Sequence, residues 1–341
     1  MGRGLEQSRT TGLCGWLRKP RVMSLPGCPA CRKAVNTVAI EKYGRYQLFA
    51  CADCGLQFWE PRVMPDARWY EQMYGGRDAK ELALEPGHKF FLSDSNVPRR
   101  GTLLDIGCGT GNFLAAARAA GFDVTGTELD RNAARFAKEE LKLPRVLPLS
   151  ITEFGVQHGE EQFDFVTFFE VLEHQADPRA FLTAAKELVK RGGFVALSVP
   201  NRDRWLKGPD VFDYPPNHFL RWDAASLKKA LNAAGFEVVS IKEEEASLKH
   251  TAMNVNMALR TGMTKAASGE IEASFRDVMQ MESAQAKAAI NAKVSAPRHM
   301  LEILAGVKRW ACYPLALAAM PYVRWKKYKG SYLYCLAKKL N

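Results

Sequence analysis

The stretch of this chain with the clearest chemistry is residues 103–111, which read Leu-Leu-Asp-Ile-Gly-Cys-Gly-Thr-Gly. An apolar strand pattern runs into a loop with glycine at every second position, and an acid stands two residues ahead of the first glycine. Residues Asn112 to Ala120 then predict a helix that ends at Gly121. Such a turn lets bare backbone approach a nucleotide-like ligand in front of the helix N-terminus. The pattern therefore indicates a cofactor site.

Two common cofactor classes do not fit this loop. A phosphate-binding P-loop needs Gly-Lys-Ser/Thr, but Gly111 is followed by Asn112. A dinucleotide loop is spaced G-x-G-x-x-G, and here the third glycine comes one position early. The pattern Asp105-x-Gly107-x-Gly109-x-Gly111 instead resembles the first motif of the class I S-adenosylmethionine (SAM) methyltransferases. Their cofactor carries an amino acid tail and no phosphate, so an acid beside it attracts the ammonium group.

A second acid supports a nucleoside ligand. Residues 123–128 predict a short strand, and its last residue, Glu128, lies 17 positions after Gly111. A carboxylate at the tip of the second strand can accept hydrogen bonds from both hydroxyls of a ribose. NAD enzymes recognise ribose in the same way, so Glu128 leaves the type of nucleoside open. The alternative is a surface glutamate at the end of a strand.

The chain then alternates predicted strands and helices. Further strands are expected at 145–149, 163–169, 194–199, 236–242 and 332–338. Helices are expected at 131–141 with Asp130 as N-cap, at 178–191, and up to Gly235 with Asp223 as N-cap. Strands separated by helical segments predict an α/β fold with a doubly wound parallel sheet, which binds its ligand at the carboxyl ends of the strands.

The resemblance extends to residues 163–182 and 188–200. Both look like blocks of the branch that contains the ubiquinone-pathway O-methyltransferases and many methyltransferases of polysaccharide and secondary-metabolite clusters. It covers about 100–243 and the final strand, and it implies a seven-stranded Rossmann-like sheet with the last strand antiparallel beside the sixth. The resemblance bears on fold and cofactor and leaves the substrate open.

Carried over residue by residue, the resemblance implies a SAM site of ten residues: Asp105, Gly107, Gly109, Gly111, Glu128, Leu129, Ile151, Thr152, Phe169 and Glu170. The first four would surround the methionyl tail, and Glu128 would bind the ribose. Leu129 would pack on the adenine, with Ile151 and Thr152 near its edge. Backbone of Phe169 and Glu170 would lie near the amino group. The family often has an acid directly after the third strand, and this chain departs from it with Leu149-Ser150-Ile151-Thr152-Glu153.

Two histidines are candidate catalytic residues. Methyl transfer from a sulfonium is an in-line displacement, so holding the nucleophile, methyl and sulfur collinear in a dry pocket supplies most of the catalysis. A hydroxyl acceptor also needs a base, and His174 is expected near the end of the fourth strand. His218 lies in a loop that borders the acceptor pocket in this fold. A structural role is the alternative for both.

His174 also closes the sequence Glu170-x-x-Glu173-His174. Such an acid-acid-imidazole cluster can bind a divalent metal that acidifies a phenol or diol, as the resemblance to ubiquinone O-methyltransferases implies. The alternative is that Glu170 contacts cofactor while Glu173 and His174 form structural hydrogen bonds at the start of a helix.

Four cysteines upstream form a second motif. Cys28-x-x-Cys31 and Cys51-x-x-Cys54 are separated by 19 residues, a spacing typical of a four-thiolate zinc ribbon. Four thiolates fill the tetrahedral shell of Zn²⁺, so this metal would be structural. Disulfides or unligated thiols are the alternatives. The ribbon also resembles an amino-terminal module of some of these methyltransferases, which implies a place beside the cofactor cleft, where it shapes the acceptor site.

The charge distribution argues against a nucleic-acid partner. The net charge is +11, but residues 1–27 contribute +4 and residues 297–341 contribute +8. The remaining residues 28–296 hold 34 basic and 35 acidic side chains and sum to −1. The ribbon and the predicted catalytic core therefore lack the broad basic face that RNA binding needs.

The carboxyl-terminal cluster of positive charge consists of two basic and aromatic segments on either side of an apolar one. Residues 308–310 are Lys-Arg-Trp, 311–323 are apolar with two prolines, and 324–329 are Arg-Trp-Lys-Lys-Tyr-Lys. Thirteen apolar residues are too few to span a bilayer, which needs about 20. Basic and aromatic flanks suit a segment at a membrane surface or a lid over a lipid-linked acceptor. A buried helical hairpin is the alternative.

These observations predict five regions: a basic, disordered extension (1–22), a zinc ribbon (23–62), a helical linker (63–98), a SAM-dependent methyltransferase domain (99–243 and 330–341), and a helical substrate cap (244–329) with a long helix near 271–295. No signal peptide is apparent, so a cytoplasmic localisation is expected. Residues 308–329 are expected to contact the inner face of the membrane. The oligomeric state stays open.

The predicted activity is methyl transfer from SAM, with structural Zn²⁺, to the oxygen of a small, sugar, quinone-like or lipid-linked acceptor. The alternatives are an RNA methyltransferase and a SAM-binding zinc-ribbon interaction protein without turnover.

Overall fold

The computed structural model describes residues 27–35, 38–65, 69, 83–205, 213–263 and 298–340, with side chains outside 257–263 and 298–311. The predicted extension at 1–22, part of the predicted linker and the helix expected near 271–295 lie outside the described residues.

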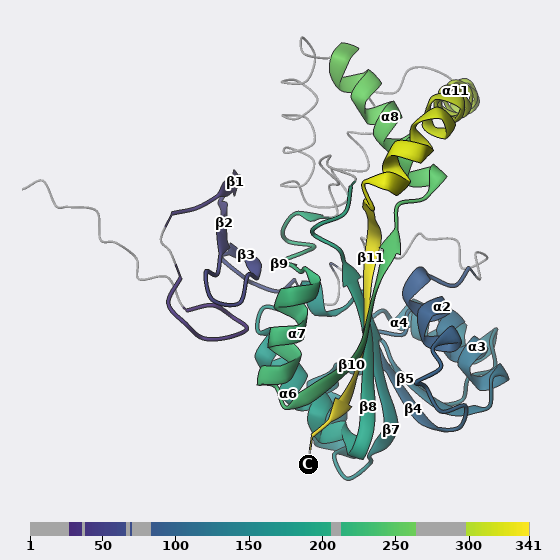
Figure 1. The fold of residues 1–341 in the computed structure, drawn as a ribbon. Helices are drawn as coiled ribbons and strands as arrows, with labels where there is room; N and C mark the ends of the chain where they lie inside the picture. Colours follow the sequence, from purple (N-terminus) through teal and green to yellow (C-terminus); the bar gives the residue numbers. More distant parts are fainter. Residues whose placement is uncertain are drawn as a thin grey trace, which may run out of the picture.

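The centre of the molecule is a seven-stranded sheet with the order β10-β11-β8-β7-β4-β5-β6 (Figure 1). Its strands are β4 (Gly101–Ile106), β5 (Phe122–Thr127), β6 (Val146–Leu147), β7 (Phe163–Phe169), β8 (Val189–Pro200), β10 (Phe236–Glu245) and β11 (Lys329–Lys339). Strands β4 to β8 pair in parallel, and β11 pairs antiparallel with both β10 and β8. The predicted doubly wound sheet and its antiparallel last strand are confirmed.

Helices cover both faces of this sheet. The helices are α2 (Pro86–Ser93), α3 (Asn112–Ala119), α4 (Arg131–Glu139), α5 (Ile151–His158), α6 (Pro178–Leu188) and α7 (Ala224–Ala233), with a short 3₁₀ turn η1 (Leu172–His174) after β7. Alternate residues of the central strands enter two separate cores: Leu103 and Phe165 pack with α2, α3 and α4, whereas Leu104 and Val166 pack with α5, α6 and α7. This period of two is what a sheet buried on both faces requires.

Polar caps begin several helices where the sequence predicts them. Asp130 accepts hydrogen bonds from the backbone of Asn132 and Ala133, and Asp223 accepts one from Ser226 N–H. These caps satisfy backbone donors that the first helical turn leaves without partners. Both predicted N-caps are confirmed.

The end of α6 differs from the prediction. The helix ends at Leu188 rather than Arg191, and β8 begins at Val189 rather than Phe194. The pairing of β8 with β7 shifts register between Phe163↔Val189 and Phe165↔Phe194, so the extra residues form a bulge around Gly192–Gly193. Lys190 Nζ of this bulge lies 3.0 Å from Asp164 Oδ1 on β7, an ion pair that only the paired strands bring together.

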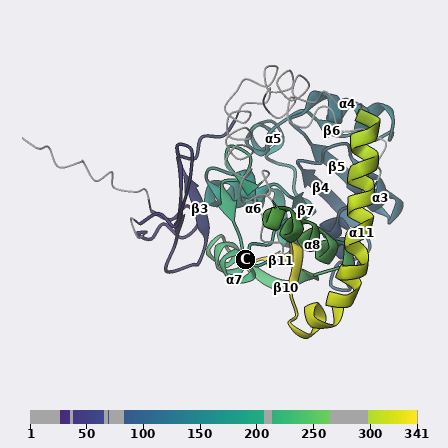
Figure 2. The same cartoon turned by 90° about the horizontal axis from the view of Figure 1, so that it is seen from above.

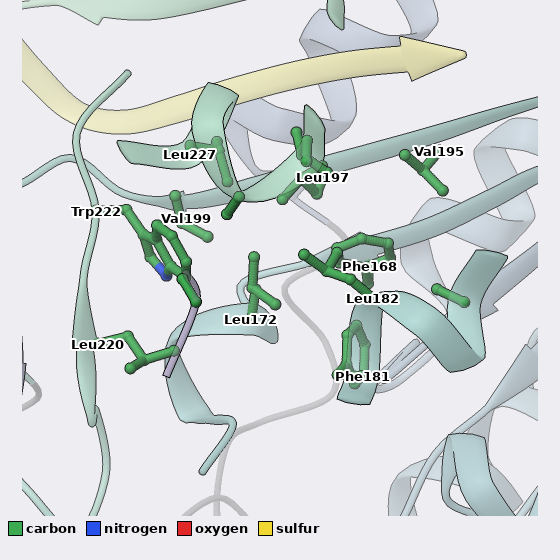
Figure 3. Packing of buried hydrophobic residues seen from close by; sticks show 14 of the residues in the cluster. Phe168, Leu172, Phe181, Leu182, Val195, Leu197, Val199, Leu220, Trp222 and Leu227 are labelled. Atoms are coloured by element: carbon green, nitrogen blue, oxygen red, sulfur yellow. The ribbon is translucent and has the colours of Figure 1, made fainter. Parts of the chain in front are cut away.

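The N-terminal module forms a small sheet together with the main body. Strands β1 (Glu41–Tyr43), β2 (Tyr46–Ala50) and β3 (Gln57–Glu60) pair antiparallel, and β3 continues onto β9 (Leu220–Arg221), which follows β8 in the chain. Figure 3 shows Leu220 and Trp222 beside Leu172 and Val199, and all four belong to one core cluster with Phe58 of β3. The module is thus packed into the body and shares its core.

Two helices stand above the sheet at the edge where the parallel strands end (Figures 1 and 2). Helix α8 (Leu248–Met263) follows β10, and α11 (Arg298–Trp325) precedes β11. They pack on one another through Ala252, Cys312 and Ala316. No helix among the described residues is long and apolar enough to cross a membrane.

Candidate active site

The glycine loop after β4 has the backbone that a bound ligand requires. Gly107, Gly109 and Gly111 have φ of +73°, +54° and +83°, a region that favours glycine. A Cβ atom at Gly107 would lie 2.8 Å from Val171 Cγ2, and one at Gly111 would lie 2.7 Å from Leu143 Cδ1. A Cβ at Gly109 would meet nothing within 4 Å. Close packing therefore explains why Gly107 and Gly111 cannot carry a side chain, whereas the open space beside Gly109 can accommodate a ligand.

Asp105 places a buried carboxyl group beneath this loop. It lies at the end of β4, is 3% exposed, and accepts a hydrogen bond of 2.7 Å from Thr167 Oγ1. Burial raises the pKa of Asp105 to about 8, against the opposing effect of Thr167. A cationic ammonium group beside it would favour the ionised carboxylate. The site thus fits the amino acid tail of SAM.

Glu128 joins the glycine loop to the next turn. Its Oε2 accepts a hydrogen bond from Gly109 N–H and its Oε1 accepts one from Asp130 N–H, both at 2.8 Å. Burial raises the pKa of this carboxyl above its ordinary value. Each carboxylate oxygen can accept a further bond. Glu128 therefore has the capacity to bind two ribose hydroxyls while it holds the loop.

The three residues expected near the adenine lie at the starts of two helices, α4 and α5. Leu129 is half-buried before α4, Ile151 is buried in the first turn of α5, and Thr152 is exposed. Glu153, the nearest acid, accepts hydrogen bonds of 2.7 Å from both the N–H and the hydroxyl of Ser150. It therefore caps the helix, and no contact in the structure assigns it to a ligand.

Phe169 and Glu170 end β7 at the same edge. The Phe169 ring is buried and lies 4.8 Å from the Phe113 ring, centre to centre. Glu170 has φ of +55°, which is strained for a residue other than glycine. Its backbone N–H donates to the Ser198 carbonyl, and its Oε1 accepts from Ser198 Oγ at 2.8 Å. Burial raises the pKa of Glu170 to about 7.

Three residues at this edge were not singled out from the sequence. His88 of α2 stacks on Phe113 with ring centres 5.0 Å apart, and burial lowers its pKa to about 4. Tyr332 of β11 donates a hydrogen bond of 3.0 Å to Glu85, just before α2. No local pattern joins Glu85 to a partner 247 positions away, and only the fold brings the two together.

The two candidate catalytic histidines meet around a buried acid. Glu173 is fully buried, and neither of its carboxylate oxygens has a hydrogen-bond partner. Nε2 of His174 lies 3.8 Å and Nε2 of His218 lies 3.9 Å from Glu173 Oε1. Burial lowers the pKa of His174 to about 3, whereas burial and Glu170 raise the pKa of Glu173 well above its ordinary value. The geometry thus defines a three-residue group, His174–Glu173–His218.

Glu170 is not a member of this group. The three side chains His174, Glu173 and His218 can present ligand atoms within 4.8 Å of one another, whereas Glu170 bonds to Ser198. A cation here would thus meet one carboxylate and two imidazoles, and His218 stands where the sequence pattern placed Glu170. Carboxylate oxygen and imidazole nitrogen are suitable ligands for a divalent metal, and a buried unpaired carboxylate fits one.

Backbone hydrogen bonds connect this group to the N-terminal module. Phe219 N–H donates to the Glu173 carbonyl at 2.9 Å, and Trp59 N–H of β3 donates to the Phe219 carbonyl at 2.9 Å. His174 Nδ1 lies 2.6 Å from the Asn217 carbonyl oxygen. The loop that carries His218 is thus held between η1 and β3.

The four cysteines of the module converge on one point. The Sγ atoms of Cys28 and Cys54 are 3.5 Å apart, as are those of Cys31 and Cys51, and all four lie within 4.8 Å of one another. No disulfide joins them. A tetrahedral zinc site with Zn–S bonds of about 2.3 Å has sulfur atoms about 3.8 Å apart. The four thiols can therefore hold Zn²⁺.

Comparison with known proteins agrees with the fold. The profile of a family described as "Methyltransferase domain" matches residues 76–241. The ubiquinone biosynthesis O-methyltransferase of Dinoroseobacter shibae is 36% identical over 182 residues, 48% of this chain and 70% of that protein. The chain belongs to the class I SAM-dependent methyltransferases.

Other similar proteins match over shorter stretches or at lower identity. The ubiquinone biosynthesis O-methyltransferase of Aromatoleum aromaticum is 40% identical over 105 residues, 30% of this chain and 44% of that protein. The chain thus spans less than half the length of that relative. Among solved structures, the cyclopropane synthase MmaA2 from Mycobacterium tuberculosis has a TM-score of 0.48 at 16% identity, covering 81% of this chain and 99% of that one.

Proposed function

We propose that this protein transfers a methyl group from SAM to a hydroxyl oxygen of a quinone-like acceptor. The observation that carries the proposal is the open space beside Gly109, in a loop that is flanked by the buried carboxyl group of Asp105 and is held by a hydrogen bond to Glu128. The relatives that support the acceptor class are named for ubiquinone biosynthesis. The hydroxyl groups of sugars and of lipid-linked acceptors offer the same nucleophile, so these molecules are the alternative acceptors.

The residues divide between holding the cofactor and preparing the acceptor. Asp105 would hold the ammonium group, and Glu128 would bind the ribose hydroxyls. When bound, SAM supplies an electrophilic methyl group on a positively charged sulfur. Catalysis then depends on orientation, because a collinear approach of the acceptor oxygen in a site closed to water lowers the barrier most.

The group His174–Glu173–His218 would deprotonate or orient the acceptor hydroxyl. Burial lowers the pKa of His174 to about 3, so its imidazole is neutral at pH 7 and can accept a hydrogen bond that orients the acceptor hydroxyl. Glu173 lies within 4 Å of both rings, where its ionised form would stabilise an imidazolium as one forms. The three residues would therefore act together on one acceptor proton.

A divalent metal on the same group is a second candidate for this step. The specific observation in its favour is Glu173, whose two oxygens are buried without hydrogen-bond partners. Bound there, a metal would acidify a phenol or diol. Metal analysis of the purified protein after mild chelation that leaves the cysteine cluster loaded separates the two: retained transfer supports the base, and loss that Mg²⁺ restores supports the metal.

The cysteine cluster is proposed to hold one structural Zn²⁺. Its geometry fits four thiolates, and a filled shell leaves no position for substrate. We expect one equivalent of zinc per chain by elemental analysis beyond any metal at His174–Glu173–His218. Absence of zinc from protein purified without chelators would contradict this assignment.

Methyl-labelled SAM tests the proposed activity. Purified protein is incubated with it and with small-molecule, lipid, glycan and RNA fractions of a lysate. The proposal expects label in the small-molecule or lipid fraction. Label in RNA, or tight SAM binding with no label in any fraction, would overturn it.

A further inference from the structure

Helix α11 carries an apolar face that is turned away from the other elements among the described residues. We propose that this outer face docks the protein on an anionic lipid bilayer. We define the outer face as the exposed residues of the helix between 314 and 322: Pro314, Leu315, Leu317, Ala318, Pro321 and Tyr322. Docking through this outer face does not depend on the proposed methyl transfer.

The packing stripe of α11 is already occupied. Four residues of this stripe are buried: Cys312, Ala316, Met320 and Val323. The first two pack on Ala252 of α8, and the last two pack on Ala246 just before α8. Their spacing of three and four residues follows one side of a helix. The remaining sides would be polar on an ordinary surface helix. Here Leu315 is 55%, Leu317 63% and Tyr322 51% exposed.

Positive charge and aromatic rings border this outer face. Arg324, Trp325, Lys326 and Lys327 follow at the C-terminal end of the helix, all exposed, and we call them the basic collar. Lys326 Nζ lies 4.5 Å from the centre of the Trp325 ring, which is itself 72% exposed. Residues 312–328 contain no acid.

The combination favours a bilayer over other occupants. Apolar side chains bordered by Trp, Tyr, Lys and Arg are typical of the boundary between acyl chains and headgroups. The collar complements anionic lipids, whereas a second copy docked through this face would bring like charges together. RNA would leave the apolar face without a partner.

The outer face also leads directly into the candidate active site. After the collar, Tyr328 stacks on Trp205 with ring centres 5.0 Å apart, and Trp205 N–H donates to the Lys329 carbonyl. Tyr332, four residues after Tyr328, reaches Glu85. A bilayer at α11 would therefore lie near the edge of the sheet where the acceptor is expected (Figure 1).

Vesicle flotation tests the proposal with the full chain. The protein is mixed with vesicles of phosphatidylcholine alone or of phosphatidylcholine with phosphatidylglycerol. We expect flotation with the anionic vesicles, weakened by added salt because the collar charges are screened. The double variant Leu315→Glu/Leu317→Glu should lower the vesicle-bound fraction at least about tenfold, and Lys326→Gln/Lys327→Gln should remove the preference for anionic lipid.

Matched controls keep the test sharp. Val156→Glu changes an apolar side chain on α5 that is 83% exposed, and it should float like the wild type. Unchanged thermal unfolding of each variant shows that it folds. Failure of the wild type to float, or equal flotation of Leu315→Glu/Leu317→Glu, would overturn the proposal. So would a wild-type dimer in sedimentation that this variant dissociates, since the face would then be an interface between copies.

Discussion

The two halves of the candidate active site are built in different ways. On the cofactor side, Asp105, Gly109 and Glu128 come from one short stretch of chain around β4 and β5, and Glu128 accepts a hydrogen bond from Gly109 N–H. On the acceptor side, contacts join distant segments, as Tyr332 to Glu85 and Trp59 to Phe219 do. A local motif can specify the first half, whereas the second exists only in the folded chain.

Loss of the zinc proposed for the four cysteines of the N-terminal module is the change with the largest expected effect on the two halves. Cys51→Ser should remove the metal and release β3, because structural zinc contributes about 10–16 kcal/mol to the folding of small metal modules. We expect methyl transfer to fall about 1,000-fold while SAM affinity stays within about threefold of the wild type. Calorimetry and the transfer assay measure the two. Asp53→Ala, at an exposed position of the same knuckle, is the control.

If SAM affinity falls as far as transfer does in Cys51→Ser, the two halves are not separable.

Glu128→Ala should act on the opposite half. It removes two hydrogen bonds to backbone and the proposed bonds to ribose, which is worth about 3 kcal/mol, or ~100-fold in the dissociation constant for SAM. Titration calorimetry measures this. Glu139→Ala on the exposed side of α4 should leave the constant unchanged. An unchanged constant for Glu128→Ala would refute the assignment of this residue.

Glu173→Gln should lower turnover and spare the cofactor. The amide keeps the shape but cannot ionise between His174 and His218, so kcat is expected to fall about 100-fold, at the lower end of the range for loss of acid–base catalysis. Steady-state kinetics with saturating SAM measures kcat. The control is Glu187→Gln, at an exposed position of α6. A variant with normal kcat would assign Glu173 a structural role.

The pH dependence of SAM binding is the smallest expected effect. Because the pKa of Asp105 is raised to about 8, most of the carboxyl is protonated at pH 7 and ionised at pH 9. Only the ionised form attracts an ammonium group, so affinity should rise up to about tenfold as pH increases from 7 to 9. Asp105→Asn should bind more weakly and lose this dependence. A flat profile for the wild type would contradict the role of Asp105.

The sequence predicted the cofactor half more fully than the acceptor half for a physical reason. Positive φ, capping and strand alternation are local, so the loop at 107–111, the caps Asp130 and Asp223, and the strand at 163–169 could be placed in advance. The bulge at 189–193 could not, because it depends on register with β7.

The acceptor half needed the folded chain. The resemblance implied that the ribbon lies near the cleft, but the pairing of β3 with β9 arises only when segments about 160 positions apart meet. Likewise, the spacing Glu170-x-x-Glu173-His174 grouped three neighbours, whereas the fold turns Glu170 toward Ser198 and brings His218 to Glu173.

The most direct test of the account is the product of a single reaction. A catechol-type acceptor is incubated with SAM and the purified chain, and the product is analysed by mass spectrometry with fragmentation. The account predicts one methyl group on a ring oxygen and one equivalent of S-adenosylhomocysteine for each product formed. Methyl on carbon or nitrogen, or bound SAM with no methylated product from any hydroxyl acceptor tried, would contradict it.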